Sequence, residues 1–181
     1  MNIKELPAEL SGLRLFELPV FRDERGFFVE RFREDKWAAL GLGVHFVQEN
    51  HSRSAPRVLR GLHYQIDPAQ GKLVACLRGR IFDVVVDLRA GSRTFGKWWG
   101  TELSDENARV LWVPFGFAHG FCVLGNEPAD VVYKVDGVYN PKTEGGIRWD
   151  DPTVGVRWPV ASPLVSPRDV ALPGLSGFKG L

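Results

Sequence analysis

Two of the four histidines stand inside apolar segments, where a titratable ring needs a partner. His63 lies in VLRGLHYQ, residues 58–65, and His119 lies in WVPFGFAHGFCVL, residues 112–124. An imidazole changes its protonation near neutral pH, so such a side chain can remove a proton, bind a metal or form a structural hydrogen bond. A lone histidine on a strand is more often structural than functional, and the surrounding residues must decide between these roles.

A metal site is the first chemistry that the two histidines suggest. Metal-binding cupins have an HxH motif followed by Glu and a second motif, PxGxxH. Pro114, Gly116 and His119 fit the second motif, but the first retains only His63, with Gln65 in the place of the second histidine. Two imidazoles fall short of the three or more protein ligands typical of a catalytic zinc or facial-triad iron. We therefore expect no metal, which argues against a metal-dependent dioxygenase.

Two further side chains have the chemistry to handle charge or protons beside the histidines. Lys72 follows the loop QIDPAQG, which can return a strand antiparallel to the one that carries His63. Tyr133 lies in the alternating segment ADVVYKVDGVY. A single lysine is usually solvated and a buried tyrosine is usually structural, so neither residue alone indicates a function.

The segment with His63 also carries an arginine and a glycine. Strict alternation along a strand places Arg60 and His63 on opposite faces. A glycine inside a strand often marks a bulge, so we predict that Gly61 forms one and re-aims Arg60 toward the face of His63.

The elements that position these residues are predicted to be strands. Short segments rich in Val, Phe, Trp and Leu alternate with clusters of Gly, Pro, Asp and Ser about every dozen residues, which is typical of all-β proteins. The predicted strands are 13–19, 27–32, 44–52, 58–65, 72–77, 81–88, 98–103, 110–113, 118–123 and 131–138. The best helix signal is 34–40, closed by Gly41 in a left-handed cap.

This number of antiparallel strands favours a cupin-like jelly-roll barrel with few short helices and a tapered pocket. The proline-rich tail from Asp150 onward is predicted to wrap the barrel in extended form. We expect a single domain over residues 1–181.

The composition of the chain indicates which partners it can bind and in which compartment it is expected. Lys and Arg total 23 against 22 for Asp and Glu, so no overall basic charge exists to bind nucleic acid or an anionic membrane. Cys76 and Cys122 lie in apolar surroundings without metal-site spacing, which predicts buried free thiols. No secretory signal or long uncharged apolar run is found, so a soluble cytoplasmic protein is expected.

An ordered set of longer motifs resembles the dTDP-4-dehydrorhamnose 3,5-epimerases from about Leu13 to about Pro173. The motifs are FRDERGFFVERF, FVQENHSRS, VLRGLHYQ, GKLVACLRGRIFDVVVDLR, SRTFGKWWG, VPFGFAHGF, VYKVDGVYNPKTEGGIRWDDP and WP. The resemblance implies a jelly-roll homodimer that acts on a dTDP-linked 4-keto-6-deoxyhexose in the pathway to dTDP-L-rhamnose. It also implies that neither a metal nor an organic cofactor is needed.

That reaction makes specific demands on the site. A ketone at C4 acidifies the protons on C3 and C5, so inversion requires a base, a stabiliser for the enolate oxygen and an acid on the opposite face. The resemblance implies that His63 is the base and Tyr133 the acid. It further implies that Lys72 steadies the enolate and that Asp169, in the tail segment SPRDV, orients His63. Asp83, in RIFDV, is a candidate to orient one of the two histidines.

Substrate-binding residues follow from the same resemblance. They comprise Arg25, Arg60 and Arg168 near the pyrophosphate, Tyr139 against the thymine ring, and Glu30, Gln48, Glu49, Asn50, His119 and Glu144 as polar contacts. Glu49 stands where Asp is usual in the family, and Arg168 replaces a frequent Lys. The segment from Arg25 to Glu30 is expected to reach in from the partner subunit.

Two rival functions stay open at this point. A mono-epimerase that inverts only C3 or only C5 can carry the same base, carboxylate and acid. A sugar-binding cupin without catalysis is the other alternative, since a fold alone does not imply a function. The complete set of His63, Asp169, Lys72 and Tyr133 argues against such an inert binder.

Overall fold

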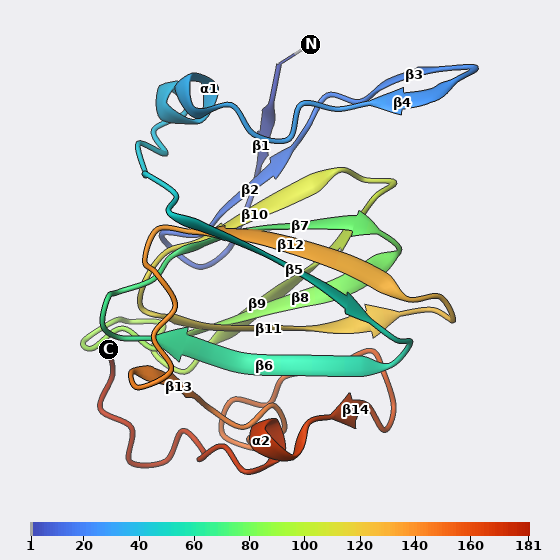
Figure 1. Cartoon of the computed structure of the whole chain (residues 1–181). Coiled ribbons are helices and arrows are strands. Elements are labelled where there is room, and N and C mark those ends of the chain that lie inside the picture. The colour runs from blue at the N-terminus through green and yellow to red at the C-terminus, as the bar shows by residue number, and fades with distance from the viewer. Residues whose placement is uncertain (1) are drawn as a thin grey trace.

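Two six-stranded sheets face each other in the computed structural model of the chain, which describes residues 2–181 (Figure 1). The first sheet has the order β1 (Lys4–Leu6), β2 (Arg14–Glu17), β10 (Arg109–Val113), β7 (Lys72–Arg78), β12 (Ala129–Val135) and β5 (Gln48–Ser54). The second has the order β13 (Glu144–Gly146), β6 (Val58–Gln65), β11 (Phe117–Leu124), β8 (Arg80–Asp87) and β9 (Trp98–Ser104). A short strand, β14 (Leu164–Val165), adds to β6 in parallel, whereas the other neighbours pair antiparallel. The predicted all-β jelly-roll fold is confirmed.

The main core lies between the sheets, where alternate side chains of both point inward. Val74 and Leu111 of the first sheet belong to the same buried cluster as Val85 and Phe121 of the second. Because residues on a strand alternate between faces, the polar side chains on these inner faces also point between the sheets. The interior therefore offers both an apolar core and a place for buried polar groups.

The outer faces of both sheets are covered as well. Helix α1 (Glu34–Ala39) lays Trp37 against Phe16 on the first sheet, with ring centroids 5.0 Å apart in an edge-to-face contact. The tail covers the second sheet, where Val84 and Val86 share a cluster with Leu175 (Figure 1). Since β8 is buried on both faces, it carries the continuous apolar run Val84–Val86 rather than a strict alternation.

Most strand predictions hold to within two residues, and β6 matches its predicted range. Three ranges need correction. The predicted strand 27–32 ends at Phe28 as β4 (Gly26–Phe28), the strand at 44–52 begins only at Gln48, and the strand at 131–138 ends at Val135. Outside the strands, Phe32 and Phe46 pack against the core, whereas Val138 is 57% exposed, so hydrophobicity alone overstates the strand length. The predicted left-handed cap at Gly41 is confirmed by its φ of +82°.

The tail packs against the barrel as predicted but is not wholly extended. It contains β14 and helix α2 (Pro167–Val170), whose first turn is capped by the Ser166 side chain, 3.1 Å from the Asp169 amide nitrogen. Serine at the cap followed by proline at the first helical position favours a helix start. Among residues 2–181, no helix has the length and apolar character needed to cross a membrane.

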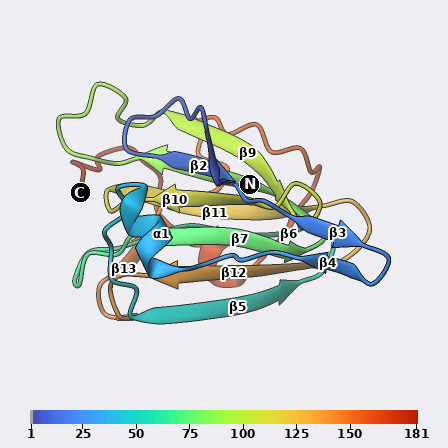
Figure 2. The ribbon, with the colours of Figure 1, turned by 90° about the horizontal axis from the view of Figure 1, so that it is seen from above.

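A two-stranded hairpin of β3 (Phe21–Asp23) and β4 projects away from both sheets (Figures 1 and 2). Three of its aromatic side chains are largely exposed: Phe21 at 49%, Phe27 at 53% and Phe28 at 67%. Clustered exposed aromatic residues are unusual on a monomeric surface and mark sites of association.

Candidate active site

A cavity of about 670 Å³ lies between the sheets, where β5 of the first sheet faces β6 of the second. Alternation along β5 directs Gln48, Asn50 and Ser52 into this cavity. Strands β6, β7, β11, β12 and β13, the loop that carries Tyr139 and the tail complete the wall. A space of this size suits a small organic ligand.

The pairing of β6 with β11 is interrupted beside the cavity. His63 pairs with His119, whereas Arg60 pairs with Phe121, so two residues of β6 oppose one residue of β11. This is the arrangement of a β-bulge. Both Arg60 and His63 consequently line the cavity, which confirms the predicted bulge and its effect on Arg60.

Glycine is required at the bulge itself. Gly61 has a φ of +122°, and a β-carbon there would lie 2.6 Å from the Cα atom of Gly120 on the neighbouring strand. A larger residue would both adopt a disfavoured backbone conformation and collide with β11. The bulge therefore depends on close backbone contact between the two strands.

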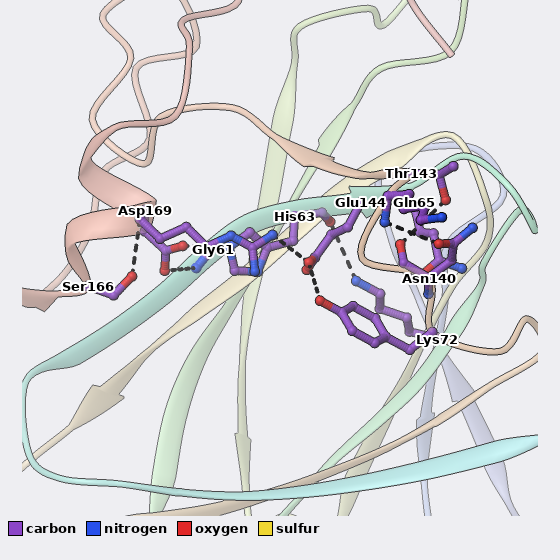
Figure 3. A network of polar contacts seen from close by, with 12 residues as sticks. Gly61, His63, Gln65, Lys72, Asn140, Thr143, Glu144, Ser166 and Asp169 are labelled. Carbon is purple, nitrogen blue, oxygen red and sulfur yellow. Dashed lines mark hydrogen bonds and ion pairs between the residues drawn. The ribbon is translucent and has the colours of Figure 1, made fainter.

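His63 forms a close pair with a carboxylate from the tail. Its Nε2 atom lies 2.7 Å from Oδ1 of Asp169, and Oδ2 of Asp169 accepts the Gly61 N–H over 3.3 Å (Figure 3). Burial raises the pKa of Asp169, but the hydrogen bond and charge of His63, together with the hydrogen bonds of Gly61 and Ser166, outweigh that effect, so the pKa lies below its ordinary value. Asp169 is thereby held as a carboxylate that can orient the ring and stabilise its protonated form.

A second pair lies deeper in the barrel. Nε2 of His119 lies 3.0 Å from both carboxylate oxygens of Asp83, which is fully buried on β8. The structure thus settles which histidine Asp83 orients: His119 and not His63.

Lys72 and Tyr133 enter the cavity from the first sheet, opposite β6. The Nζ atom of Lys72 lies 3.5 Å from the backbone carbonyl oxygen of His63. Burial lowers the pKa of Lys72 to about 8, although the charges of Glu144 and Asp83 act in the other direction. Burial raises the pKa of Tyr133, so its phenol holds a proton at neutral pH.

A polar cluster stands at the mouth of the cavity. The Tyr139 hydroxyl donates to Oε2 of Glu144 over 2.8 Å, and Arg168 donates to the same oxygen. The backbone N–H of Tyr139 donates to Gln48, whose side chain in turn donates to Asn50, each over 2.9 Å. Loop, strand and tail residues from distant parts of the chain therefore meet at one opening.

Three predicted substrate contacts do not reach the cavity of their own chain. Arg25 lies in the projecting hairpin and pairs with Asp23, and Glu30 pairs with Lys36, with Nζ and Oε1 2.6 Å apart. Glu49 pairs with Lys134 and lines a separate pocket on the outer face of the first sheet, because it alternates with Gln48 and Asn50. The other eleven predicted site residues all line the cavity: His63, Lys72, Tyr133, Asp169, Gln48, Asn50, Arg60, His119, Tyr139, Glu144 and Arg168.

Sequence reasoning missed polar residues that belong to this region. Ser52 follows Gln48 and Asn50 at the alternating positions of β5, and Ser166 caps the helix that presents Asp169. The alternation of β5 was a usable signal for Ser52, and the run Ser-Pro-Arg-Asp was one for Ser166.

Within residues 2–181, no group of three or more His, Cys, Asp and Glu side chains is placed to hold a metal ion. Each of the two cavity histidines faces one carboxylate instead. Cys76 and Cys122 are buried free thiols, as predicted, and burial raises the pKa of each to about 12.

Comparisons with known proteins agree on one family. The family model described as dTDP-4-dehydrorhamnose 3,5-epimerase matches residues 7–177. The dTDP-4-dehydrorhamnose 3,5-epimerase of Shigella flexneri is 52% identical over 172 residues, which cover 94% of this chain and 93% of that protein. The crystal structure of the dTDP-6-deoxy-D-glucose-3,5-epimerase of Legionella pneumophila, in complex with dTDP-4-keto-L-rhamnose, superposes with a TM-score of 0.92. It is 45% identical and covers 96% of this chain and 93% of its own.

A relative that is named for inversion at C3 alone is also similar. The dTDP-4-dehydrorhamnose 3-epimerase of Streptomyces niveus is 44% identical over 149 residues, which cover 81% of this chain and 72% of that protein.

Proposed function

Because the chain belongs to the dTDP-4-dehydrorhamnose 3,5-epimerase family, we propose that it inverts C3 and C5 of dTDP-4-dehydro-6-deoxy-D-glucose. The product is dTDP-4-dehydro-L-rhamnose, an intermediate on the way to dTDP-L-rhamnose. The observation that carries the proposal is the His63–Asp169 pair, with atoms 2.7 Å apart, inside a cavity that also receives Lys72 and Tyr133.

His63 acts as the base. When its Nε2 carries the proton and donates to Asp169, the lone pair of Nδ1 is available to the substrate. The C4 ketone acidifies the neighbouring protons, so an imidazole placed beside one of them can remove it. The Asp169 carboxylate then stabilises the imidazolium that forms, as the aspartate of a catalytic triad does.

Lys72 stabilises the enolate. Removal of the proton places negative charge on the C4 oxygen, and a preorganised ammonium in a desolvated site lowers the energy of that state. The position of Nζ beside the backbone of the base supports this role.

Tyr133 returns the proton from the other side. Inversion requires that the proton leave from one face of the sugar and arrive on the opposite face. His63 belongs to β6 in the second sheet and Tyr133 to β12 in the first, so the two side chains enter the cavity from opposing walls. The raised pKa of Tyr133 keeps the acid protonated until the enolate accepts its proton.

The cavity mouth binds the nucleotide. Arg60 and Arg168 supply guanidinium groups suited to bidentate contact with the pyrophosphate. Tyr139 is 46% exposed there and presents a ring on which thymine can stack, while Gln48 and Glu144 contribute polar contacts. His119, fixed by Asp83, contacts the sugar.

The active form is a homodimer in which the β3–β4 hairpin of one protomer reaches the cavity of its partner. Three exposed phenylalanines on the hairpin and its projection from the sheets support this arrangement. Arg25 and Glu30 then complete the partner's nucleotide site, which explains why neither side chain reaches the cavity of its own chain.

Mixed dimers test this exchange. Arg25→Ala and His63→Ala proteins, each of low activity, are unfolded together, refolded and assayed. If Arg25 serves the partner, each mixed dimer holds one intact site, and random pairing restores about a quarter of the wild-type activity. No recovery would mean that Arg25 serves the site of its own chain, and full activity of the Arg25→Ala protein alone would mean that it serves no site.

Isotope exchange tests the reaction itself. The protein is incubated with dTDP-4-dehydro-6-deoxy-D-glucose in deuterated water, and the label is located by NMR. Deuterium at both C3 and C5 of an inverted product supports the double epimerase. Label at C3 alone supports a 3-epimerase, the second candidate favoured by the Streptomyces niveus relative. Label at neither carbon contradicts both.

A cytoplasmic location is part of the proposal. A nucleotide-linked sugar as substrate and two buried free thiols support it. Fractionation of cells that carry the protein tests this location.

A further inference from the structure

Gln65, at the end of β6, joins two loops beside the cavity through its side-chain amide. The residue is only 2% exposed. Its Nε2 atom donates to the carbonyl oxygens of Pro68 and Val138, each over 2.9 Å, and its Oε1 atom accepts the N–H of Asn140 over 2.7 Å. Both amide hydrogens and the amide oxygen therefore have partners.

Two of these three contacts lie on either side of one cavity residue. The carbonyl of Val138 immediately precedes Tyr139, and the N–H of Asn140 immediately follows it. The N–H of Tyr139 itself donates to Gln48. Two glutamines thus fix three consecutive backbone positions around an exposed aromatic side chain.

The same loop leads into the next polar group of the cavity mouth. Glu144 lies opposite Gln65 in the pairing of β13 with β6 (Figure 3), and it accepts the Tyr139 hydroxyl over 2.8 Å. Asn140 also donates through its side chain to the carbonyl of Asp67 over 2.8 Å. The loop that carries Tyr139 is consequently tied to the end of β6 at several points.

Gln65 itself does not line the cavity. It occupies the place of the second histidine of the cupin metal motif, yet its amide neither titrates near neutral pH nor supplies an imidazole ligand. Direct participation in the chemistry is therefore excluded, and the loop contacts are what the residue contributes.

We propose that Gln65 is a positioning residue that holds Tyr139 and Glu144 in the geometry needed to receive the nucleotide. The proposal rests on the assignment of the cavity mouth to dTDP. Without the buried amide, the carbonyl of Val138 and the N–H of Asn140 lose their partners, and the loop has to rearrange to satisfy them. Nucleotide binding then weakens, while the chemistry at His63 is unaffected.

The variant Gln65→Met tests this, because methionine matches the size of glutamine but lacks its hydrogen-bonding groups. We expect KM for the dTDP-sugar to rise about tenfold while kcat changes less than about twofold, since only binding common to ground state and transition state is lost. The dissociation constant for dTDP, measured by calorimetry, should rise in parallel.

Gln70→Ala is the matched control. The Gln70 amide donates to the carbonyl of Gly137 over 2.8 Å and joins the same two loops, but it does not contact the residues that flank Tyr139. A positioning role predicts less than about a twofold change of KM in Gln70→Ala. An equal increase in both variants would show only that the loops need general support, which would overturn the proposal.

A double-variant cycle identifies the route of the effect. If Gln65 acts through Tyr139, Gln65→Met should weaken dTDP binding in the wild-type background but have little further effect in a Tyr139→Ala background. Additive losses would overturn the proposal.

Gln65→Glu is the second variant should Gln65→Met fail to fold, because it keeps the size and the acceptor for Asn140 while losing both amide donors. The same split between KM and kcat is expected, and loss of the fold in both variants would overturn the proposal in favour of a purely structural role.

The dTDP titrations distinguish failure of the proposed epimerase function from failure of the proposed role of Gln65. If the wild-type protein binds dTDP without epimerising any dTDP-sugar, the proposed function fails while the Gln65 comparison still gives its result.

Discussion

The cavity contains two histidine–aspartate pairs that differ in how they are built. His63 and His119 are pairing partners on β6 and β11, and each places Nε2 within 3.0 Å of a carboxylate. Asp83 comes from β8, the strand beside β11, whereas Asp169 comes from the tail, 106 residues beyond His63. Side-chain exposure is 23% for His63 but 8% for His119.

The difference shows how position assigns a role to the same pair of groups. The inner pair is assembled within one sheet and nearly buried, with only the His119 ring on the cavity wall, so it supplies a fixed, oriented ring. The outer pair is assembled across the fold and opens onto the cavity, so its second nitrogen can meet a substrate. Proton transfer is accordingly expected at His63, and substrate positioning at His119.

The strongest test of this contrast replaces each histidine. His63→Ala removes the base and should lower kcat by about 10³-fold, with loss of deuterium exchange at both C3 and C5. His119→Ala is the matched control and should retain measurable exchange at both carbons. Substantial exchange in His63→Ala would refute its assignment as the base.

Replacing Asp169 should mainly lower the rate of the reaction, whereas replacing Asp83 should mainly lower the stability of the fold. Asp169→Asn should lower kcat about a hundredfold, because the imidazolium loses its stabilising charge. Asp83→Asn should lower kcat by less than about tenfold but reduce the free energy of unfolding by about 1–3 kcal/mol, since a fully buried hydrogen-bonded carboxylate is altered. Measurements of kcat and of thermal denaturation for both variants check this contrast. A larger loss of kcat in Asp83→Asn than in Asp169→Asn would contradict the assigned roles.

Tyr133→Phe separates the two halves of the reaction. His63 should still remove a proton, so exchange into the substrate should persist while formation of inverted product falls about tenfold or more. Parallel loss of exchange and inversion would show that Tyr133 does not act as the acid after proton removal.

The smallest expected effect is a shift in the pH dependence of activity, which Asp83 of the inner pair exerts through Lys72. The pKa of Lys72 is lowered to about 8 by burial, so the ammonium loses its proton as the pH rises through that value and the enolate loses its stabiliser. Activity should therefore decline above about pH 8. The charge of Asp83 raises the pKa of Lys72, so Asp83→Asn should shift this decline to lower pH. An unchanged alkaline limb in Asp83→Asn would show that the inner pair does not influence Lys72.

The barrel could be predicted from the sequence because its signals are local. Alternating apolar segments located β6 through β12, and the glycine inside β6 indicated the bulge that brings Arg60 beside His63. The short strands β1, β3, β13 and β14 were missed, since two or three residues become a strand only when a partner lies alongside.

The site was less accessible to local reasoning. No spacing rule links His63 to Asp169, and only the resemblance to a family suggested their contact. The sequence shows only that Gln65 stands at the position of the second histidine of the cupin metal motif. Its three hydrogen bonds depend on how two loops pack beside β6, which no local pattern predicts. Alternation along β5 does separate Glu49 from Gln48 and Asn50, a distinction that the family resemblance alone obscured.

The origin of Asp169 in the tail also sets an order of events during synthesis. The ribosome must add 106 residues after His63 before the carboxylate partner exists, by which point the strands on both sides of the cavity have already been translated. Asp169 is the last of the residues that line the cavity to be synthesised, so the base gains its partner only after every other lining residue has been added. A chain that stops just short of Asp169 therefore contains every strand of both sheets but lacks the carboxylate that pairs with His63.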